Sequence, residues 1–166
     1  MLTVDDLILD LIEHRRLATS DELAVIVAHV AQAPYATYIS RVPVKLRQVL
    51  AAQGIIVPIR LSSLQRHLYK RVYDEQQWPI NTTAGQYIND LHQAVTHPYV
   101  RIWTYYYLSQ PFVGFLAPSH VQNAVKPEAH IFVAYSPVYM TLTTGYQANS
   151  IQTVFDETYT NLLRHK

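Results

Sequence analysis

Cysteine is absent from this chain of 166 residues. Disulfide bridges, thiol nucleophiles and thiolate metal ligands are therefore excluded, because each of them needs a cysteine sulfur. No stretch approaches the roughly eighteen uninterrupted apolar residues of a membrane-spanning helix. The first residues include Asp5 and Asp6 rather than a basic region followed by a long apolar run, so we expect no secretory signal. These absences predict a soluble cytoplasmic protein without a membrane partner.

Acidic residues are missing from a long internal stretch. No Asp or Glu occurs from Leu23 to Tyr73, and the cations of this acid-free stretch are Arg41, Lys45, Arg47, Arg60, Arg66, Lys70 and Arg71. The whole chain has a formal net charge of only +1, so its positive charge is concentrated here. Such a concentration favours a polyanionic partner. We expect RNA first, with DNA or an acidic protein as alternatives, and the candidate nucleic-acid-binding residues are Arg60, Arg66, Lys70, Lys45 and Arg47.

Apolar residues and tyrosine are abundant. Apolar residues make up 49% of the chain and charged residues only 15%, a balance that is typical of a folded globule rather than a disordered chain. The chain contains thirteen tyrosines. A tyrosine suits the half-buried face of a sheet, and it also stacks on nucleobases. Sheet packing is the interpretation that we favour for most of them.

Apolar spacing predicts three helices in the first part of the chain. They span Val4–Arg15, Asp21–Gln32 and Pro43–Gln53, and the last should stop at Gly54, a natural C′ residue. With the extended run that follows, residues 1–58 could form a winged helix-turn-helix in which Lys45 and Arg47 lie on the reading helix. The alternative is an ordinary helical bundle that carries two surface cations.

Residues 59–166 are predicted to begin with two further helices. Leu61–Tyr73 fits a basic amphipathic helix, because Leu64 and Leu68 fall on an apolar stripe while Arg66 and Lys70 fall on another. A second helix is predicted for Ala84–Thr96, ending before His97 and Pro98.

The rest of this second part has the composition of β-strands. Residues of high strand propensity occupy Val100–Leu108, Phe112–Ala117, His130–Ser136 and Met140–Gln147. Short links between them predict a four-stranded antiparallel meander with the helices packed on one face, and so an α+β fold. A final helix is expected over Val154–Leu163.

One histidine stands among the cations. Nearby Arg66, Lys70 and Arg71 should depress the pKa of His67 and favour the neutral imidazole that can act as a base. Metal-independent RNA cleavage needs a base for the 2′-hydroxyl, a cation on the phosphate and an acid for the leaving oxygen. His67 and Arg71 would supply the first two. The alternative is a solvated basic helix face that includes a histidine.

Tyrosine could complete such a site, with Tyr135 or Tyr146 orienting or protonating the substrate. No histidine pair has the His-x-x-x-His spacing with a nearby carboxylate that a helical zinc site needs, so we expect neither a metal nor a cofactor.

The order of a basic helix, a second helix and a meander resembles the barnase–EndoU–colicin–RelE group of small ribonucleases, which includes many bacterial toxins. The resemblance covers about Leu61 to Ser150 and rests on three segments: His67-Leu68-Tyr69-Lys70-Arg71, Ile131-Phe132-Val133-Ala134-Tyr135-Ser136 and Thr143-Thr144-Gly145-Tyr146-Gln147. In that group the active surface lies where helix meets sheet. The resemblance therefore implies a cleft with His67, Arg71 and Tyr146 as catalytic residues and Tyr135, Thr144 and Gln147 beside them. The segment from Leu64 to Gln147 also resembles bacterial proteins of unknown function.

The sequence leaves three functions open. The first is an RNA-binding protein that also cleaves RNA without a metal. The second is a non-enzymatic module whose basic face holds DNA or an acidic protein. The third is a small-molecule sensor whose tyrosine-lined sheet encloses a ligand. An open cleft that brings His67, Arg71 and Tyr146 together would favour the enzyme, a flat basic face the module, and a closed aromatic cavity the sensor.

Overall fold

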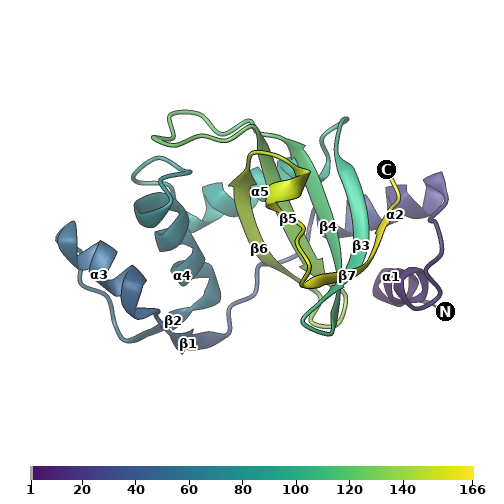
Figure 1. Ribbon diagram of the computed structural model, residues 1–166, viewed down its shortest axis with the longest axis horizontal. Coiled ribbons are helices and arrows are strands. Elements are labelled where there is room, and N and C mark those ends of the chain that lie inside the picture. The colour runs from purple at the N-terminus through teal and green to yellow at the C-terminus, as the bar shows by residue number, and fades with distance from the viewer. Residues whose placement is uncertain (1) are drawn as a thin grey trace.

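The computed structural model describes residues 2–166 and has an α+β fold (Figure 1). Its helices are α1 (Val4–Glu13), α2 (Ser20–Val30), α3 (Val44–Ala52), α4 (Ser63–Tyr69) and α5 (Ala84–Val95). Helix α4 continues as a π-helical turn, η1 (Lys70–Asp74), and a short 3₁₀-helix, η2, spans Ile151–Thr153. Within the described residues, no helix combines the length and the apolar character that a membrane crossing requires.

The ends of the helices follow local chemistry that the sequence displays. Thr3, Thr19 and Thr83 cap α1, α2 and α5, and each hydroxyl accepts the backbone N–H of the third residue of its helix. The side chain of that third residue accepts the N–H of the threonine in return, so each start is a capping box. Gly54 adopts a φ of 79° beyond the end of α3, as expected of a residue that terminates a helix. The helices predicted before residue 100 are confirmed, with ends displaced by a few residues.

The main sheet has five antiparallel strands, one more than predicted. They are β3 (Arg101–Tyr107), β4 (Gln110–Pro118), β5 (His130–Ser136), β6 (Thr141–Ala148) and β7 (Tyr159–Arg164), in the order β6-β5-β4-β3-β7. The four predicted strands are confirmed, and they pair as consecutive neighbours.

The final helix predicted for residues 154–163 is wrong, because β7 occupies the second half of that segment. Its backbone pairs with the open edge of β3, where Tyr106 lies opposite Thr160 and Thr104 lies opposite Leu163. An edge strand offers a row of unpaired N–H and C=O groups, and pairing with them outweighs weak local helix propensity. Apolar spacing in this segment fits either structure.

The two faces of the sheet are covered differently. Helices α1, α2 and α5 pack on the inner face, and the buried residues there include Ile8, Leu11, Leu91, Phe115 and Val133. The outer face is covered only in part, by Val154 and Phe155 from the segment around η2. The uncovered part of the outer face contains the candidate site.

Helix α3 belongs to a separate lobe formed by residues 38–74, which we call the basic lobe. It contains α3, α4, η1 and a two-stranded antiparallel sheet of β1 (Ile39–Arg41) and β2 (Arg60–Ser62), and it lies at the left of Figure 1. Its small core joins Leu46 and Leu50 of α3 to Tyr69 and Tyr73. Because α1 and α2 pack on the sheet instead, the three N-terminal helices do not share one core as a winged helix-turn-helix would require. Residues 1–58 contribute to both cores.

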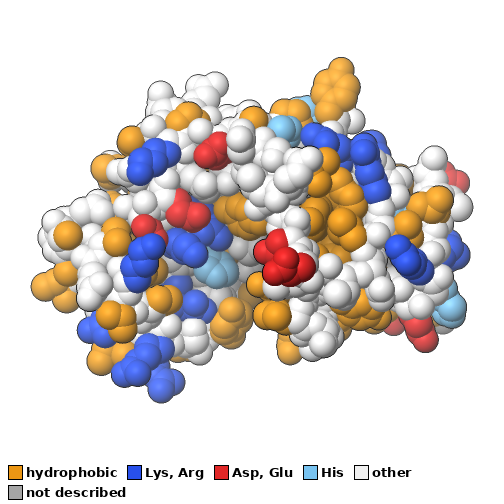
Figure 2. Space-filling view, in the orientation of Figure 1, with side chains coloured by type: hydrophobic (Ala, Val, Ile, Leu, Met, Phe, Trp, Pro, Cys, Tyr) orange, Lys and Arg blue, Asp and Glu red, His pale blue; other side chains and the backbone are white. Residues whose placement is uncertain are grey.

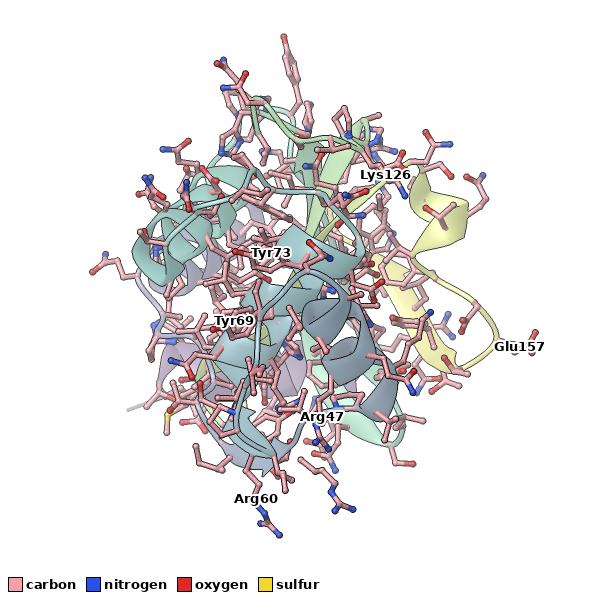
Figure 3. All side chains as sticks on the ribbon, turned by 90° about the vertical axis from the view of Figure 1, so that its left-hand side faces the viewer. Arg47, Arg60, Tyr69, Tyr73, Lys126 and Glu157 are labelled. Atoms are coloured by element: carbon pink, nitrogen blue, oxygen red, sulfur yellow. The ribbon has the colours of Figure 1, made fainter. Side chains whose placement is uncertain are left out.

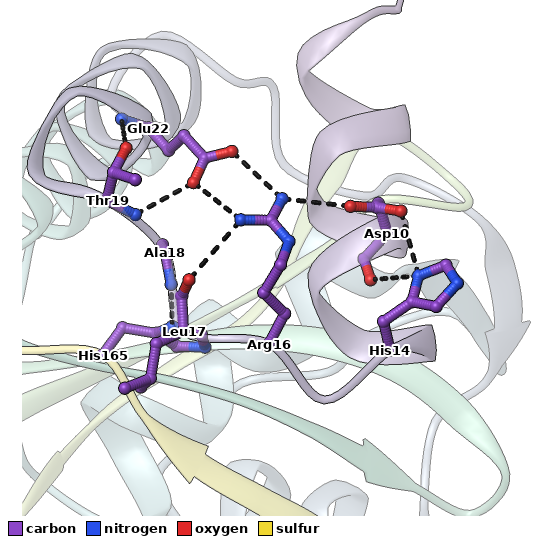
Figure 4. A network of polar contacts seen from close by, with 8 residues as sticks. All are labelled: Asp10, His14, Arg16, Leu17, Ala18, Thr19, Glu22 and His165. Atoms are coloured by element: carbon purple, nitrogen blue, oxygen red, sulfur yellow. Dashed lines mark hydrogen bonds and ion pairs between the residues drawn. The ribbon is translucent and has the colours of Figure 1, made fainter.

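A polar cluster joins the N-terminal helices to the end of the chain (Figure 4). The guanidinium of Arg16 donates to Asp10 of α1 at 3.0 Å and to Glu22 of α2 at 2.9 Å. His165 accepts the N–H of Ala18 at Nδ1, 3.0 Å away, so its Nε2–H donates to the hydroxyl of Thr104, 2.8 Å away. Burial lowers the pKa of His165, which keeps it in this neutral form. The cluster fixes α1, α2 and the C-terminal residues together.

Candidate functional site

An open pocket of about 320 Å³, which we call the His67 pocket, lies on the outer face of the sheet, beside α4. Its lining residues are His67, Tyr105, Tyr107, Phe112, Phe132, Ala134, Thr143, Thr144, Tyr146 and Tyr159. In the space-filling view, hydrophobic side chains are exposed over the sheet, and Lys and Arg side chains gather over the basic lobe at the left (Figure 2).

The aromatic floor of this pocket follows from strand alternation. Side chains of period two share a face, so Tyr105 and Tyr107 of β3 point outward together. Gly114 of β4 makes room for them, because a Cβ at this position would lie 2.8 Å from the ring of Tyr105 and 2.9 Å from that of Phe132. The rings of Tyr107 and Tyr159 pack with centroids 4.7 Å apart, so β7 builds one wall. The pocket is therefore rigid and apolar at its base.

His67 of α4 lies on the wall opposite β7, at one end of a chain of hydrogen bonds. Its Nδ1 is hydrogen-bonded to the hydroxyl of Tyr35, which lies 3.5 Å from that of Tyr87, and Tyr87 donates to the carbonyl oxygen of Gly145. The carbonyl can only accept, so Tyr87 donates to it. If Tyr35 in turn donates to Tyr87, the hydroxyl of Tyr35 accepts a hydrogen bond from His67, and Nδ1 is then the protonated nitrogen. Nε2 then carries the lone pair. It has no hydrogen-bond partner among residues 2–166, and the imidazole lines the pocket.

The surroundings of His67 keep it neutral. Burial lowers the pKa of the imidazole, and the nearby cations Arg71, Arg66 and Lys70 lower it further, to about 3. The neutral state at pH 7 agrees with the expectation from sequence, although the largest cause is burial, which the sequence does not display. His67 therefore presents an uncharged ring nitrogen to the pocket.

Arg71 lies next to this pocket but is buried and paired. Only 5% of the residue is exposed. Its Nε donates to the carbonyl oxygen of Gly145 at 2.7 Å, its Nη2 to the hydroxyl of Thr144 at 3.1 Å, and its Nη1 pairs with Glu75. The guanidinium thus ties η1 to β6 and has no free edge for a phosphate. We correct its expected role accordingly: it positions Thr144 and Tyr146 and adds positive charge beside His67.

Tyr146 is the third polar residue of this pocket, after His67 and Thr144. Its ring faces the guanidinium of Arg71, with Cζ 5.4 Å from the ring centroid. Burial and the neighbouring Tyr159 raise the pKa of the Tyr146 phenol, so the hydroxyl keeps its proton and can donate a hydrogen bond. His67 therefore meets Thr144 and Tyr146, which lie more than seventy residues further along the chain, at one pocket.

Two of the predicted cleft residues lie elsewhere. Tyr135 is buried on the inner face, where its hydroxyl donates to Asp5 at 2.6 Å and lies 2.9 Å from His29. A register shift between Ala134 and Tyr135 accompanies this placement. Gln147 is buried too, and its backbone and side chain bond to Gln77.

Gly145, which separates Thr144 from Tyr146, allows α5 to pack closely on the sheet. It is buried, and a Cβ at this position would collide with the side chain of Leu91 from α5. The close approach that glycine permits here is therefore between helix and sheet.

The predicted nucleic-acid-binding cations differ in exposure. Lys45, Arg60 and Lys70 are exposed, and Arg47 is half-buried. Figure 3 shows Arg47 and Arg60 projecting from the lower end of the basic lobe. Arg66 is half-buried and lies over the ring of Tyr38, with its Cζ 5.3 Å from the ring centroid. Because Arg71 is buried and Arg66 is half-buried, Lys70 is the exposed cation nearest to His67 in sequence.

Sequence reasoning missed most of the aromatic lining and the hydroxyl chain behind His67. The alternation of Tyr105 and Tyr107 was a usable signal, because both fall on one face of a strand. Tyr35 and Tyr87 gave no comparable signal, since their meeting with His67 depends on the packing of three separate segments.

Within residues 2–166, no three His, Asp or Glu side chains are gathered closely enough to hold a metal ion. Comparisons with protein-family models, with curated proteins and with solved structures find no significant match.

Proposed function

We propose that this protein binds single-stranded RNA along the basic lobe and cleaves it without a metal at the His67 pocket. The observation that carries the proposal is the meeting of His67, Thr144 and Tyr146 in one open pocket with an aromatic floor. This pocket adjoins the acid-free stretch, whose exposed cations Lys45, Arg60 and Lys70 are suited to phosphates.

The aromatic floor supports the binding of an unpaired base. A nucleobase stacks on tyrosine or phenylalanine rings, and each such stack contributes about 1–3 kcal/mol. A base inside a duplex is already stacked and cannot enter a pocket of this kind. The segment directly before β7 carries Asp156 and Glu157, and their carboxylates repel phosphate. The backbone of the RNA is therefore expected on the side of the basic lobe.

The proposed reaction is an internal transesterification. The 2′-oxygen attacks phosphorus, the bond between phosphorus and the 5′-oxygen breaks, and a 2′,3′-cyclic phosphate and a 5′-hydroxyl result. Nε2 of His67 takes the proton of the 2′-hydroxyl, and the hydroxyl of Tyr146 gives a proton to the leaving 5′-oxygen. Because an alkoxide is a stronger base than a phenolate, the second transfer is favourable. Proton transfer from the imidazolium to the phenolate then restores both groups.

The low pKa of His67 applies to the empty pocket. A bound phosphate offsets the repulsion from Arg71, Arg66 and Lys70, and so raises the pKa of the imidazole and its strength as a base. Lys70 remains free to contact the phosphate.

Binding is tested by its salt dependence. Replacing Lys45, Arg60 and Lys70 together with Ala should weaken the binding of single-stranded RNA. The slope of log K against log salt should also fall by about two, since each lost phosphate contact on a single strand accounts for about 0.7. A matched variant that removes Arg15, Lys126 and Lys166, exposed cations outside the acid-free stretch, should behave as wild type. Equal slopes for the two triple variants would place the RNA on another surface.

A small-molecule sensor is the second candidate. The observation in its favour is the dense aromatic lining, which suits a flat ring of any origin. A protein that binds nucleobases or nucleosides as tightly as oligonucleotides, with no dependence on salt, would fit the sensor and not the RNA-binding protein.

A further inference from the structure

A second groove continues from the His67 pocket. It has a volume of about 600 Å³ and is lined by Ala36, Thr37, Tyr38, Phe112, Tyr139, Thr141 and Thr143. Phe112 and Thr143 line the His67 pocket as well, so the two hollows share a border on the sheet. A ligand longer than one ring can therefore extend from one into the other.

Two exposed tyrosines come from opposite sides of this groove. Tyr38 precedes β1 in the basic lobe and is 60% exposed, and Tyr139 belongs to the loop between β5 and β6 and is 70% exposed. A single exposed tyrosine is ordinary, but exposed aromatic rings that gather at one groove are typical of a binding surface. The guanidinium of Arg66 lies over the ring of Tyr38, which restrains that ring before any ligand arrives. Both rings are available for stacking.

Polar groups near these rings lack partners. The hydroxyl oxygen of Thr141, on a residue that lines the groove, and Nη2 of Arg66 are buried and have no hydrogen-bond partner within residues 2–166. An unpaired buried polar atom costs free energy, and because both atoms are shielded from solvent, a ligand supplies a partner only after their side chains turn toward the groove.

A pair of cations lies a short distance along the chain from Tyr38. Arg41 of β1 and Arg60 of β2 are direct partners in the antiparallel register, and both are exposed. Like charges directly opposite each other destabilise a strand pair, and an anion bound between them removes that repulsion. Arg41 is three residues from Tyr38, roughly 10 Å along an extended chain.

We infer that this second groove holds the nucleotide adjacent to the one in the His67 pocket. The substrate is then a single strand with two consecutive unstacked bases, one in each hollow. The scissile phosphate between them lies near the shared border of the hollows, on the side that faces the basic lobe, and the next phosphate lies at Arg41 and Arg60. The inference deepens the proposed function and rests on it, because it assumes that RNA occupies the His67 pocket.

The test compares ligands of one and two bases. The probes are the four 2′-O-methyl homodinucleotides, which cannot undergo transesterification, and the matching 2′-O-methyl nucleoside 3′-monophosphates, titrated by calorimetry. We expect wild type to bind at least one dinucleotide more tightly than its monophosphate. Tyr139→Ala should weaken that dinucleotide by roughly five-fold to more than a hundred-fold, the range of one lost stack, and leave the monophosphate unchanged. Tyr38→Ala should act in the same way.

The control variant is Tyr99→Ala, which removes another exposed tyrosine, one that does not line either hollow. It should bind both ligands as wild type does. If monophosphates bind but dinucleotides bind no tighter, or if Tyr139→Ala and Tyr38→Ala have no effect, the second groove is not a nucleotide site and the proposed function stands alone. If neither ligand nor longer RNA binds to wild type, the proposed function falls and this inference falls with it.

Discussion

Two features of its surroundings determine the state of the His67 imidazole. Burial and neighbouring cations hold it neutral, and the chain through Tyr35 and Tyr87 favours the tautomer that carries the proton on Nδ1. Such second-layer hydrogen bonds decide whether a histidine donates or accepts at its free nitrogen. The chemistry available in the pocket therefore depends on residues that do not line it.

The depressed pKa of His67 predicts a loss of stability in acid. The unfolded chain takes up a proton near pH 6.5, but the folded chain does not do so until about pH 3, so the free energy of unfolding should fall as the pH drops through this window. The contribution of one histidine is at most about 1.4 kcal/mol per pH unit. Urea unfolding at pH 7, 5 and 4 should show a smaller loss in His67→Gln than in wild type.

His165 contributes to the same window, since its pKa is lowered too, and it is unchanged in the comparison. Parallel pH profiles for His67→Gln and wild type would contradict the assignment of His67 as a buried neutral group.

Arg71 predicts a contrast with its neighbour. Arg71→Met should lower the free energy of unfolding by about 3 kcal/mol, because Glu75 and Thr144 lose their shared partner in a buried site. Lys70→Met, at the exposed adjacent position, should stay within about 0.5 kcal/mol of wild type. Chemical denaturation measures both, and a similar small effect for the two variants would show that Arg71 is not structural.

The elements of this fold differ in how far local sequence determines them. Helix α5 could be predicted because Thr83 and Gln86 form a capping box and its apolar residues repeat at helical spacing. Strands β3 to β6 could be predicted from their β-branched and aromatic residues. Strand β7 could not, because its structure depends on the edge of β3 and not on its own spacing.

The same distinction applies to the candidate site. His67 and the direction of its pKa followed from neighbours on one helix. The burial of Arg71 did not, because it depends on contacts with β6 that are remote in sequence. The inner-face position of Tyr135 could have been predicted from strand alternation, since Tyr135 shares a face with Ile131 and Val133 of the buried core. Residue type and local spacing predicted which groups could do chemistry, and tertiary packing decided which of them are free to do it.

A variant of Gly114 tests the packing on the outer face of the sheet, and a variant of Gly85 in α5 serves as its control. Gly114→Ala should cost about 1–3 kcal/mol, because the added Cβ meets the rings of Tyr105 and Phe132 in a buried position. Gly85→Ala, in the first turn of α5, meets only the hydroxyl of Thr83 at 3.9 Å and should stabilise by up to about 1 kcal/mol. Thermal unfolding of the pair provides the comparison. A neutral Gly114→Ala would mean that the aromatic floor is loosely packed.

At the scale of the whole molecule, charge and shape act together. The acid-free stretch forms most of the basic lobe, and the exposed aromatic face belongs to the sheet. The pocket and the second groove lie where these two parts meet, and they include Tyr38 and His67 from one part and Phe112 and Tyr146 from the other. A polyanion with flat rings matches both parts at once, whereas a duplex would present only its backbone.

The central claim is tested most directly by incubating purified protein with single-stranded RNA in the presence of EDTA. Wild type should release products with 2′,3′-cyclic phosphate and 5′-hydroxyl ends. His67→Ala should slow cleavage by about 10²–10⁴, the usual contribution of one proton transfer, while it retains RNA binding. The control His14→Ala, which alters an exposed histidine directly after α1, should cleave as wild type does. Intact RNA after incubation with wild type, or equal cleavage by wild type and His67→Ala, would contradict the account.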